Sequence, residues 1–323
     1  MIKNFYKRYL VFYLTAVISC IACACVPTQK LNLDIPVRVS DSGLYVHFLD
    51  VGQGDAILVN LPDGKVMMID SGDRKQEINE KVSRYLKANS VTKIDYFILT
   101  HPDSDHVGGA KEILENFTVE KVYLPKPLFD DGLFPYYSEA LEVIEKKGID
   151  KEFSKSFLYE KGDDYQIAFL SPLDGGAIPN GTPTSSEINN LSSVIYLEYK
   201  SVRFLFTGDV GAEIEKEIVE EYTIGLFDVA FLEFGIKVNL ENLDFLKVSH
   251  HGARDATCAE FVNLLCPKNA VISVSGDNNF GHPNTAVLAR IFEANKDCML
   301  YRTDVKGTIT VHVSTNGTTS VIT

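Results

Sequence analysis

The stretch 101–106, His-Pro-Asp-Ser-Asp-His, constrains this chain more than any other part of its sequence. It places two imidazoles and two carboxylates between an apolar run at 96–99 and a glycine pair at 108–109. A lone Asp-x-Asp in such a turn is most often a helix cap. Two His and two Asp at this density instead indicate a site for divalent metal ions.

Three further motifs place polar groups directly after an apolar run that is typical of a strand. They are Asp-Ser-Gly-Asp at 70–73, Thr-Gly-Asp at 207–209 and Ser-His-His-Gly at 249–252. Strand ends that share one edge of a sheet bring their side chains together, and rigid strands fix ligand positions. We therefore expect these motifs to meet the 101–106 turn around bound metal.

Charge and geometry predict how these groups divide between two cations. A carboxylate can bridge two cations and a lone imidazole cannot, so Asp209 is the candidate bridge. His101 and Asp103 are expected to hold one ion, and Asp105 and His106 to point toward the second.

The ligand set of the second ion is completed by His250 in this scheme, with His251 as the alternative. Asp103 adds oxygen to the donor set, which shifts the preference from a purely zinc site toward manganese or magnesium. The expected cofactors are two divalent ions, Zn²⁺ or Mn²⁺, with Mg²⁺ as a further alternative.

The remaining sequence predicts strands mixed with single helices, which suggests two sheets sandwiched by helices. Expected strands are 44–49, 56–59, 66–69, 94–99, 121–124, 193–199, 202–206, 245–248, 270–274 and 307–313, and expected helices are 75–88, 110–116, 136–147, 212–222, 257–265 and 285–295. The segment 171–186 is rich in Gly, Pro, Ser and Asn. We interpret it as a loop inside one domain that lines the site, rather than as a domain linker.

Six motifs occur in a fixed order along residues 44–313. They are Asp-Val-Gly-Gln-Gly-Asp-Ala at 50–56, the run 101–109, Asn-Asn-Leu-Ser at 189–192, Thr-Gly-Asp at 207–209, His-His-Gly at 250–252 and Gly-His-Pro at 281–283. This order resembles that of metallo-β-lactamase-fold hydrolases and, more narrowly, the hydrolase domain of the competence protein ComEC and its stand-alone relatives.

The resemblance implies an α/β (α+β) fold: an αββα sandwich in a single domain, with a dinuclear site. The ligands that it carries over are His101, Asp105, His106, Asp209 and one of the pair His250 and His251. Asp103 stands where many family members have a further His, and the ComEC-like branch resembles this chain in having Asp there. Asn189 or Asn190 lies near the place of another metal-binding His in many relatives.

Other residues are expected to support the ligands or contact the substrate. Asp55 either lies beside the metals or caps a glycine-rich bulge. Asp70 is expected to hydrogen-bond in the His101 region rather than to touch metal, and Ser192 to contact a ligand or substrate. His282 in the late Gly-His-Pro is expected to face the substrate, and a purely structural loop histidine is the alternative.

The N-terminus resembles a bacterial lipoprotein-type signal peptide over residues 1–19. A basic segment precedes the apolar run 9–18, and Val-Ile-Ser-Cys at 17–20 resembles a lipobox. Cleavage before Cys20 would leave a lipidated thiol that anchors the exported chain to the outer face of the cytoplasmic membrane. Cys23 is an alternative site, and an uncleaved signal anchor is the other interpretation. Residues 20–42 are then a tether and 43–323 the hydrolase domain.

The chain has 31 basic and 44 acidic side chains, a formal charge of −13. Such a charge argues against tight nonspecific nucleic-acid binding, which needs a basic footprint. It leaves room for a local basic groove, for which the candidates are Lys126, Lys200, Arg203, Lys237 and Arg254.

These features predict an exported metal-dependent hydrolase, with phosphodiesters of extracellular DNA, single-stranded or duplex, as the favoured substrate. Two cations would depress the pKa of a water, and the resulting hydroxide would attack phosphorus. Asp105 or Asp209 would orient this nucleophile, and His282 would protonate the leaving alkoxide.

Two alternatives stay open. One is a metallo-hydrolase of a small ester, amide or phosphate compound, which a closed apolar pocket would favour. The other is a non-catalytic surface-binding protein on the same fold. No protein partner is inferred from the sequence.

Overall fold

The computed structural model describes residues 43–126, 133–175 and 182–323, which belong to the compact unit Pro36–Thr323. The proposed signal peptide, the tether and Cys20 lie outside the described residues, so the division of the chain at residues 19 and 42 stays a prediction. Among the described residues, no helix has both the length and the apolar character that crossing a membrane requires.

The first sheet has eight strands in the order β15-β14-β1-β2-β3-β4-β5-β6. Their bounds are β1 Gly43–Phe48, β2 Ile57–Asn60, β3 Val66–Ile69, β4 Lys93–Ile98, β5 Thr118–Leu124, β6 Asp150–Phe153, β14 Ile309–Ser314 and β15 Thr319–Ile322. Strands β3 to β6 run parallel, so their C-terminal ends share one edge of the sheet.

The second sheet has seven strands in the order β13-β12-β11-β10-β9-β8-β7. Their bounds are β7 Tyr159–Lys161, β8 Tyr165–Ser171, β9 Val194–Tyr199, β10 Val202–Phe206, β11 Phe245–Lys247, β12 Asn269–Ile272 and β13 Met299–Arg302. Strands β10 to β13 are parallel, which again collects C-terminal ends at one edge.

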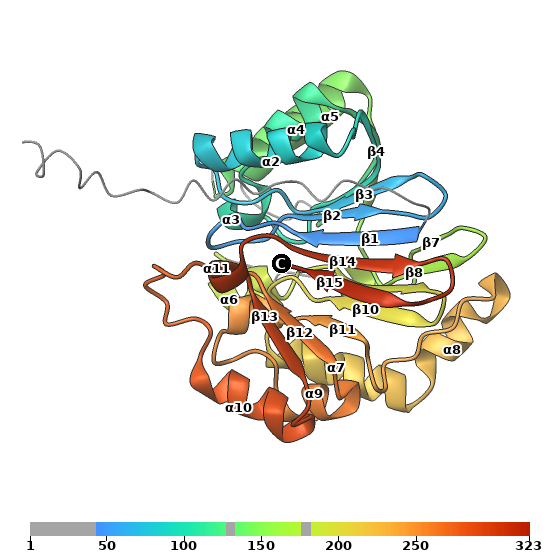
Figure 1. Ribbon diagram of the computed structural model, residues 1–323. Coiled ribbons are helices and arrows are strands. Elements are labelled where there is room, and N and C mark those ends of the chain that lie inside the picture. Colours follow the sequence, from blue (N-terminus) through green and yellow to red (C-terminus); the bar gives the residue numbers. More distant parts are fainter. Residues whose placement is uncertain (1–42, 127–132, 176–181) are drawn as a thin grey trace, which may run out of the picture. The chain divides into compact units, whose positions relative to one another are not determined.

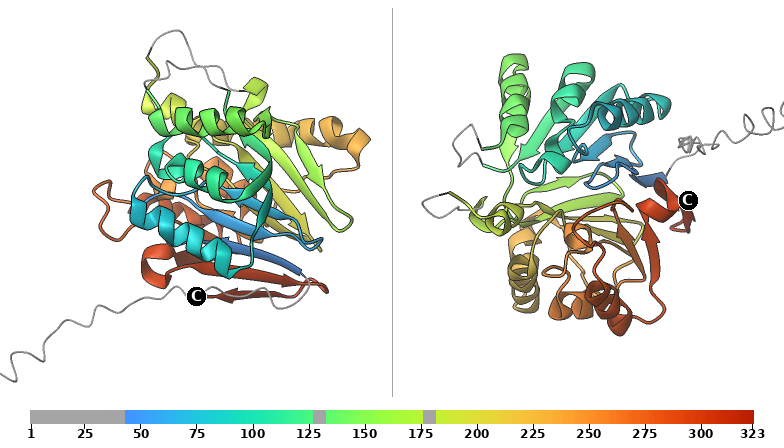
Figure 2. Two further views of the ribbon diagram at one scale, coloured as in Figure 1. Left: turned by 90° about the horizontal axis from the view of Figure 1, so that it is seen from above. Right: turned by 90° about the vertical axis from the view of Figure 1, so that its left-hand side faces the viewer.

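Helices form the two outer layers (Figures 1 and 2). Among the described residues, four precede the second sheet in sequence: α2 Gln76–Ala88, α3 Ser104–Val107, α4 Ala110–Asn116 and α5 Pro135–Lys147. The later helices are α6 Ser185–Asn189, α7 Ala212–Thr223, α8 Leu226–Phe231, α9 Ala259–Leu265, α10 Thr285–Ala294 and α11 Thr303–Lys306, with short 3-10 turns η1 Leu173–Gly175, η2 Leu232–Phe234 and η3 Ser249–Gly252.

The layering follows from the two-residue period of the strands. In β3, Met67 and Ile69 point into the core between the sheets, whereas Met68 packs in the core beneath α2, α4 and α5. Helix α2 meets that core with Val82 and Leu86, one turn apart. A third core lies between the second sheet and the later helices. The αββα sandwich predicted from the sequence is confirmed.

The elements expected from the sequence all appear, with ends shifted by a few residues. The sequence analysis did not assign β6, β7, β8, β13 and β15. Strands β6, β7 and β15 are short and largely exposed, so they lack the alternation that marks a half-buried strand. Strand β8 is apolar and buried, but it follows the loop-like stretch 154–164, and its assignment depends on pairing with β9.

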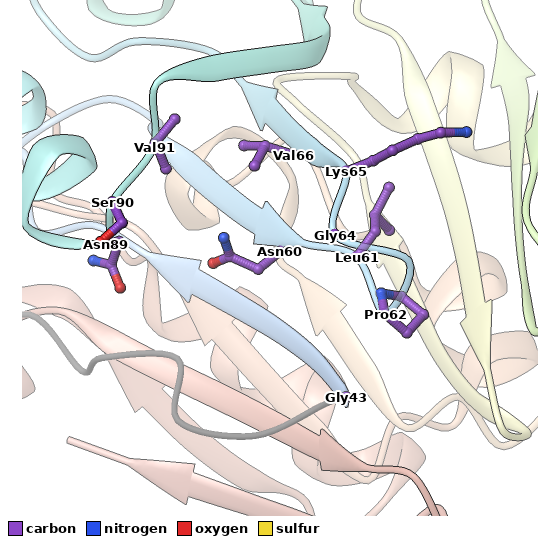
Figure 3. A pocket seen from close by; sticks show the side chains of 10 residues that line it. All are labelled: Gly43, Asn60, Leu61, Pro62, Gly64, Lys65, Val66, Asn89, Ser90 and Val91. Carbon is purple, nitrogen blue, oxygen red and sulfur yellow. The ribbon is translucent and has the colours of Figure 1, made fainter.

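A surface hollow of about 380 Å³ lies where β2 turns into β3, near the end of α2 (Figure 3). Of its ten lining residues, Lys65 alone carries a charge. The hollow therefore offers neither an acid–base pair nor a metal-ligand set.

Glu221 on α7 is an unusual buried acid. Its side chain is 5% exposed, and in the described part of the chain neither carboxylate oxygen has a hydrogen-bond partner. Burial, together with the charges of Glu217 and Glu220, raises the pKa of Glu221 to about 7.

Replacing Glu221 with Gln should therefore stabilise the protein at alkaline pH. Between the unfolded pKa near 4.5 and the folded value near 7, the unfolded chain releases the proton first, so the parent loses stability as pH rises. The Glu221→Gln variant lacks this loss, and we expect it to gain about 1–3 kcal/mol over the parent between pH 4 and 8.

Denaturant unfolding of both proteins at several pH values measures the difference between their free energies of unfolding. The contributions of all other titrating groups are the same in the two proteins and cancel in this difference. A difference in unfolding free energy that stays constant from pH 4 to 8 would contradict the raised pKa.

Candidate metal centre

Four strand ends from two different sheets supply the polar groups of this site. In the first sheet, Asp70 follows β3 and His101 follows β4. In the second sheet, Asp209 follows β10, and the turn η3, which contains His251, follows β11. Parallel pairing within each sheet brings each pair of ends to the same edge.

Ser192 joins the two sheets at this edge. Its hydroxyl accepts a hydrogen bond from the backbone N–H of Asp209 at 3.0 Å and lies 3.2 Å from Nδ1 of His101. The next residue, Ser193, donates its backbone N–H to the carbonyl of Thr100 at 3.2 Å. The start of β9 thus holds the two sheets in register at the site.

Close backbone approach also needs glycine here. At Gly54 φ is +121°, and a Cβ would meet the carbonyl oxygen of Asp105 at 2.2 Å. This approach allows the backbone N–H of Asp55 to donate to that carbonyl at 3.2 Å. The Gly-Gln-Gly-Asp motif therefore brings Asp55 against the 101–106 turn.

Three buried imidazoles are each held through Nδ1. His106 Nδ1 lies 2.7 Å from Oδ2 of Asp70, and His251 Nδ1 donates to the carbonyl of Ser273 at 2.8 Å. His101 Nδ1 lies between hydroxyl groups of neighbouring residues. In all three, the buried Nε2 has no hydrogen-bond partner among the described residues.

Asp209 lies between these free nitrogens. Its Oδ1 is 3.4 Å from Nε2 of His106, and its Oδ2 is 3.3 Å from Nε2 of His251. Donor atoms lie within 4.8 Å of one another in four overlapping groups of the described residues. Two of them are His101, His106 and Asp209, and Asp105, His106 and His251. The other two contain Asp55, once with Asp209 and His251 and once with Asp70 and His106.

The residues present fit divalent cations. Buried polar atoms almost always have a partner, and orphaned ones mark a missing ion or water. Here the orphans are imidazole nitrogens and carboxylate oxygens, the usual ligands of Zn²⁺ and Mn²⁺. Nδ1 of each imidazole already has a hydrogen-bond partner that fixes the orientation of the ring, as is usual for metal-bound histidine.

The charge balance points the same way. Asp55, Asp70 and Asp209 are buried, and Lys247 is the buried ammonium that faces them. The carboxylates outweigh burial and raise the pKa of both His106 and His251, so without a metal ion the protons on these imidazoles offset the excess of negative charge. A divalent cation would take the place of these protons, because imidazole binds metal in its neutral form.

The two acids of the 101–106 turn lie at the rim. The Asp103 side chain is 37% exposed, with Oδ2 3.8 Å from Nε2 of His101, and partial burial raises its pKa to about 6. The Asp105 side chain is 32% exposed, with Oδ2 3.7 Å from Nε2 of His251. Asp105 is thus near His251 as well as near His106.

His250 and His251 differ sharply. His251 is 1% exposed and belongs to the donor groups, whereas His250 is 26% exposed and has Nε2 3.8 Å from Oδ2 of Asp209. The amide Nδ2 of Asn189 donates to His250 Nε2 at 3.3 Å. Both histidines have positive φ, 48° and 54°, which costs energy and turns their side chains apart.

A cavity of about 240 Å³ opens beside His250. Its lining includes Asn189, Asn190, Asp209 and Asp255. Asn190 is occupied by local contacts, because its Oδ1 accepts from the backbone N–H of Gly211. His250 thus lies between the buried donor group and a space large enough for part of a substrate.

The ring of His282 meets the ring of His250 edge-on, with the centroids 5.6 Å apart. Its Nδ1 is buried without a hydrogen-bond partner in the described chain. Burial and the neighbouring imidazoles of His250 and His251 lower the pKa of His282.

The sequence analysis missed Lys247. Its Nζ lies 2.5 Å from Oδ2 of Asp55, donates to the carbonyl of Gly208 at 2.8 Å and lies 3.6 Å from Oδ1 of Asp209. Burial lowers the pKa of Lys247, but the nearby carboxylates outweigh this and raise it, so it stays charged. The sequence feature that could have revealed it is a lysine within the otherwise apolar run 245–248, shortly before the His-His pair.

Two of the five candidates for a basic groove, Arg203 and Lys200, lie away from this edge. Arg203 donates to the carbonyls of Asn239, Glu241 and Asn242, near the start of β10 and away from Asp209. Lys200 pairs with Asp164 beside the same strand end.

Comparisons with known proteins agree with this geometry. A family model described as the metallo-β-lactamase superfamily matches residues 49–276. The chain is 30% identical over 280 residues to ComE operon protein 3 of Bacillus subtilis, covering 82% of the chain and 32% of that protein. It is 24% identical over 274 residues to competence protein ComA of Neisseria gonorrhoeae, covering 85% and 33%.

The chain therefore spans about a third of the length of these two relatives. Among solved structures it is similar to Igni18, described as a novel metallo hydrolase from the archaeon Ignicoccus hospitalis. That match has 16% identity and a TM-score of 0.46, and it covers 86% of this chain and 99% of the other.

Replacing Asp70 with Asn should weaken metal binding without removing a ligand. The carboxylate fixes His106 and accepts two further hydrogen bonds from Thr100, so its charge raises the basicity of the imidazole. We expect the Kd for Mn²⁺ or Zn²⁺, measured by isothermal titration calorimetry, to rise about 10- to 100-fold.

Asp73→Asn is the matched control, because Asp73 pairs with Lys75 nearer the surface and belongs to no donor group. Equal metal affinity in the Asp70 variant, the Asp73 variant and the parent would contradict the assigned role.

Proposed function

The chain belongs to the metallo-β-lactamase superfamily, and from this premise we propose that it is a phosphodiesterase that acts on DNA outside the cytoplasm. The observation that carries the proposal is the set of three buried imidazoles whose free Nε2 atoms surround Asp209. Bound divalent cations supply Lewis-acid stabilisation of phosphoryl oxygens and lower the pKa of a water.

Two groups of residues would hold the cations. His101, His106 and Asp209 form one, and Asp105, His106 and His251 the other, with Asp103 adjoining the first. Asp70, Ser192 and the carbonyl of Ser273 keep the imidazoles in place, so little reorganisation is needed.

In this proposal Asp105 orients the nucleophilic water. This carboxylate is partly exposed and reaches within 3.7 Å of His251, so it can accept a hydrogen bond at the boundary between the buried donors and solvent. Asp209 is buried, with only 3% of its surface exposed, and it lies among the imidazoles, so it is better suited to holding cations than to orienting the water.

His282 faces the leaving oxygen in this proposal. Its lowered pKa keeps the ring neutral at pH 7, so it offers a hydrogen bond rather than a positive charge. His250, adjacent to it and beside the cavity, contacts the substrate as well.

Two arginines near the ligands support a phosphate-containing substrate. Arg74 lines a cavity of about 280 Å³ together with Asp103 and Asp105, and its guanidinium lies 5.7 Å from the ring centre of Tyr136. Arg254 is exposed three residues after His251. A planar guanidinium suits phosphate oxygens.

Two of the similar proteins are named for competence, ComE operon protein 3 through its operon and ComA directly, which supports DNA as the substrate. The charge of −13 and the modest cavities favour a second candidate, hydrolysis of a small ester, amide or phosphate compound. The intact donor set argues against a non-catalytic binding protein.

Replacing Asp209 with Asn should abolish hydrolysis while the fold persists. The amide keeps the shape but lacks the negative charge that would help His101 and His106 hold a cation, so we expect a loss of at least about 100-fold in kcat. The assay uses the full chain with Mn²⁺, Zn²⁺ or Mg²⁺ on single-stranded DNA, duplex DNA, RNA, bis(p-nitrophenyl) phosphate and simple esters.

Asp228→Asn, an exposed change on α8, is the control that should retain full activity. Circular dichroism reports the fold of both variants. Parental rates in the Asp209 variant on every substrate would refute the mechanism, and cleavage of esters but not phosphodiesters would favour the second candidate.

We also propose that the chain is exported and anchored by lipid at Cys20. Changing Cys20 to Ser should abolish incorporation of labelled palmitate and release the protein from the membrane fraction, because the thiol is the acceptor. Cys23→Ser is the control. If labelling were lost only in the Cys23 variant, Cys23 would be the lipid acceptor. If neither the parent nor the variants were labelled, the proposed lipid anchor would be wrong.

A further inference from the structure

Phe280 is an exposed aromatic residue beside the candidate metal centre. Its side chain is 70% exposed, in the loop between β12 and α10 that also carries His282. Single exposed apolar side chains are common on protein surfaces, so the case for a role of Phe280 depends on what its ring contacts.

The ring continues a row of aromatic side chains that leads to the buried donors. Phe280 and His282 stack with centroids 5.6 Å apart and planes 26° apart, and His282 meets His250 edge-on at 5.6 Å. His250 Nε2 is 3.8 Å from Oδ2 of Asp209.

The loop that carries Phe280 is tightly held. Asn278 makes four hydrogen bonds within it: Oδ1 accepts from the backbone N–H groups of Phe280 and His282, and Nδ2 donates to the carbonyls of Ser275 and His282. The ring is therefore presented on a fixed backbone rather than on a loose loop.

Both ends of the loop are attached to motifs of the site. The backbone N–H of Ser275 donates to Oε1 of Gln53 in the Gly-Gln-Gly motif at 3.4 Å. The backbone N–H of Asn284 donates to the carbonyl of Gly252 at 2.8 Å, directly after the His-His pair. The position of Phe280 is thus fixed relative to the metal ligands.

We propose that Phe280 stacks on a nucleobase of the substrate next to the scissile phosphate. The proposal rests on the phosphodiesterase function above and narrows it to substrates with a flat base beside the bond that is cut. Stacking needs no basic surface and accepts every base, which suits an acidic chain that acts on nucleic acid. The ring is a substrate-binding residue and takes no part in bond cleavage.

The test compares two single-stranded oligonucleotides of about 12 residues, one of thymidine and one with abasic sugars. Stacking is worth about 1–3 kcal/mol per base, so Phe280→Ala should reduce kcat/KM on the thymidine strand about 5- to 150-fold, mainly through KM. The preference over the abasic strand should shrink by the same factor, and Phe280→Trp should restore it.

Phe292→Ala removes another exposed phenylalanine, two turns into α10, and should keep the parental preference. An unchanged preference in Phe280→Ala would overturn the proposal and leave the phosphodiesterase function intact. So would a parent that cleaves bis(p-nitrophenyl) phosphate but, by fluorescence anisotropy, binds neither strand. A parent without phosphodiesterase activity that also binds neither strand would refute both proposals.

Discussion

The hydroxyl of Ser192 makes the contact on which the site depends, because it links His101 of one sheet to the backbone of Asp209 in the other. Each sheet alone supplies only part of a ligand set. Asp209 receives a defined position relative to His106 only when the two sheets are fixed at this edge. The large apolar core between the sheets stabilises the sandwich, and this small polar contact sets its register where the chemistry lies.

Burial then gives the site its affinity for cations. The carboxylates and imidazoles are enclosed, so water does not satisfy them, and Lys247 neutralises only part of their charge. Some backbone strain lies in the same place, with positive φ at Asp70, His250 and His251. A fold tolerates such costs where function requires a fixed arrangement, and each strained residue here either binds a ligand group or faces the cavity.

The pattern of apolar runs ending in polar motifs was enough to predict the layers and the edge at which the site forms. Strands such as β6 and β7 were not predicted, because they are short and their mostly exposed residues show no alternation of buried and exposed positions. The same limit applies to Lys247. Its pairing with Asp55 joins the first and last thirds of the domain, and no local pattern shows such a contact.

The sequence by itself determined the chemical types at the centre, since the two His and two Asp in 101–106, Asp209 and the His-His pair carry donor atoms that suit divalent cations. Only the tertiary structure decided which of the adjacent histidines turns inward. It also decided that Asp70 lies behind His106 and that Phe280 lies beside His282. The physical reason is that side-chain direction depends on backbone φ and on contacts between distant strands, whereas residue identity is local.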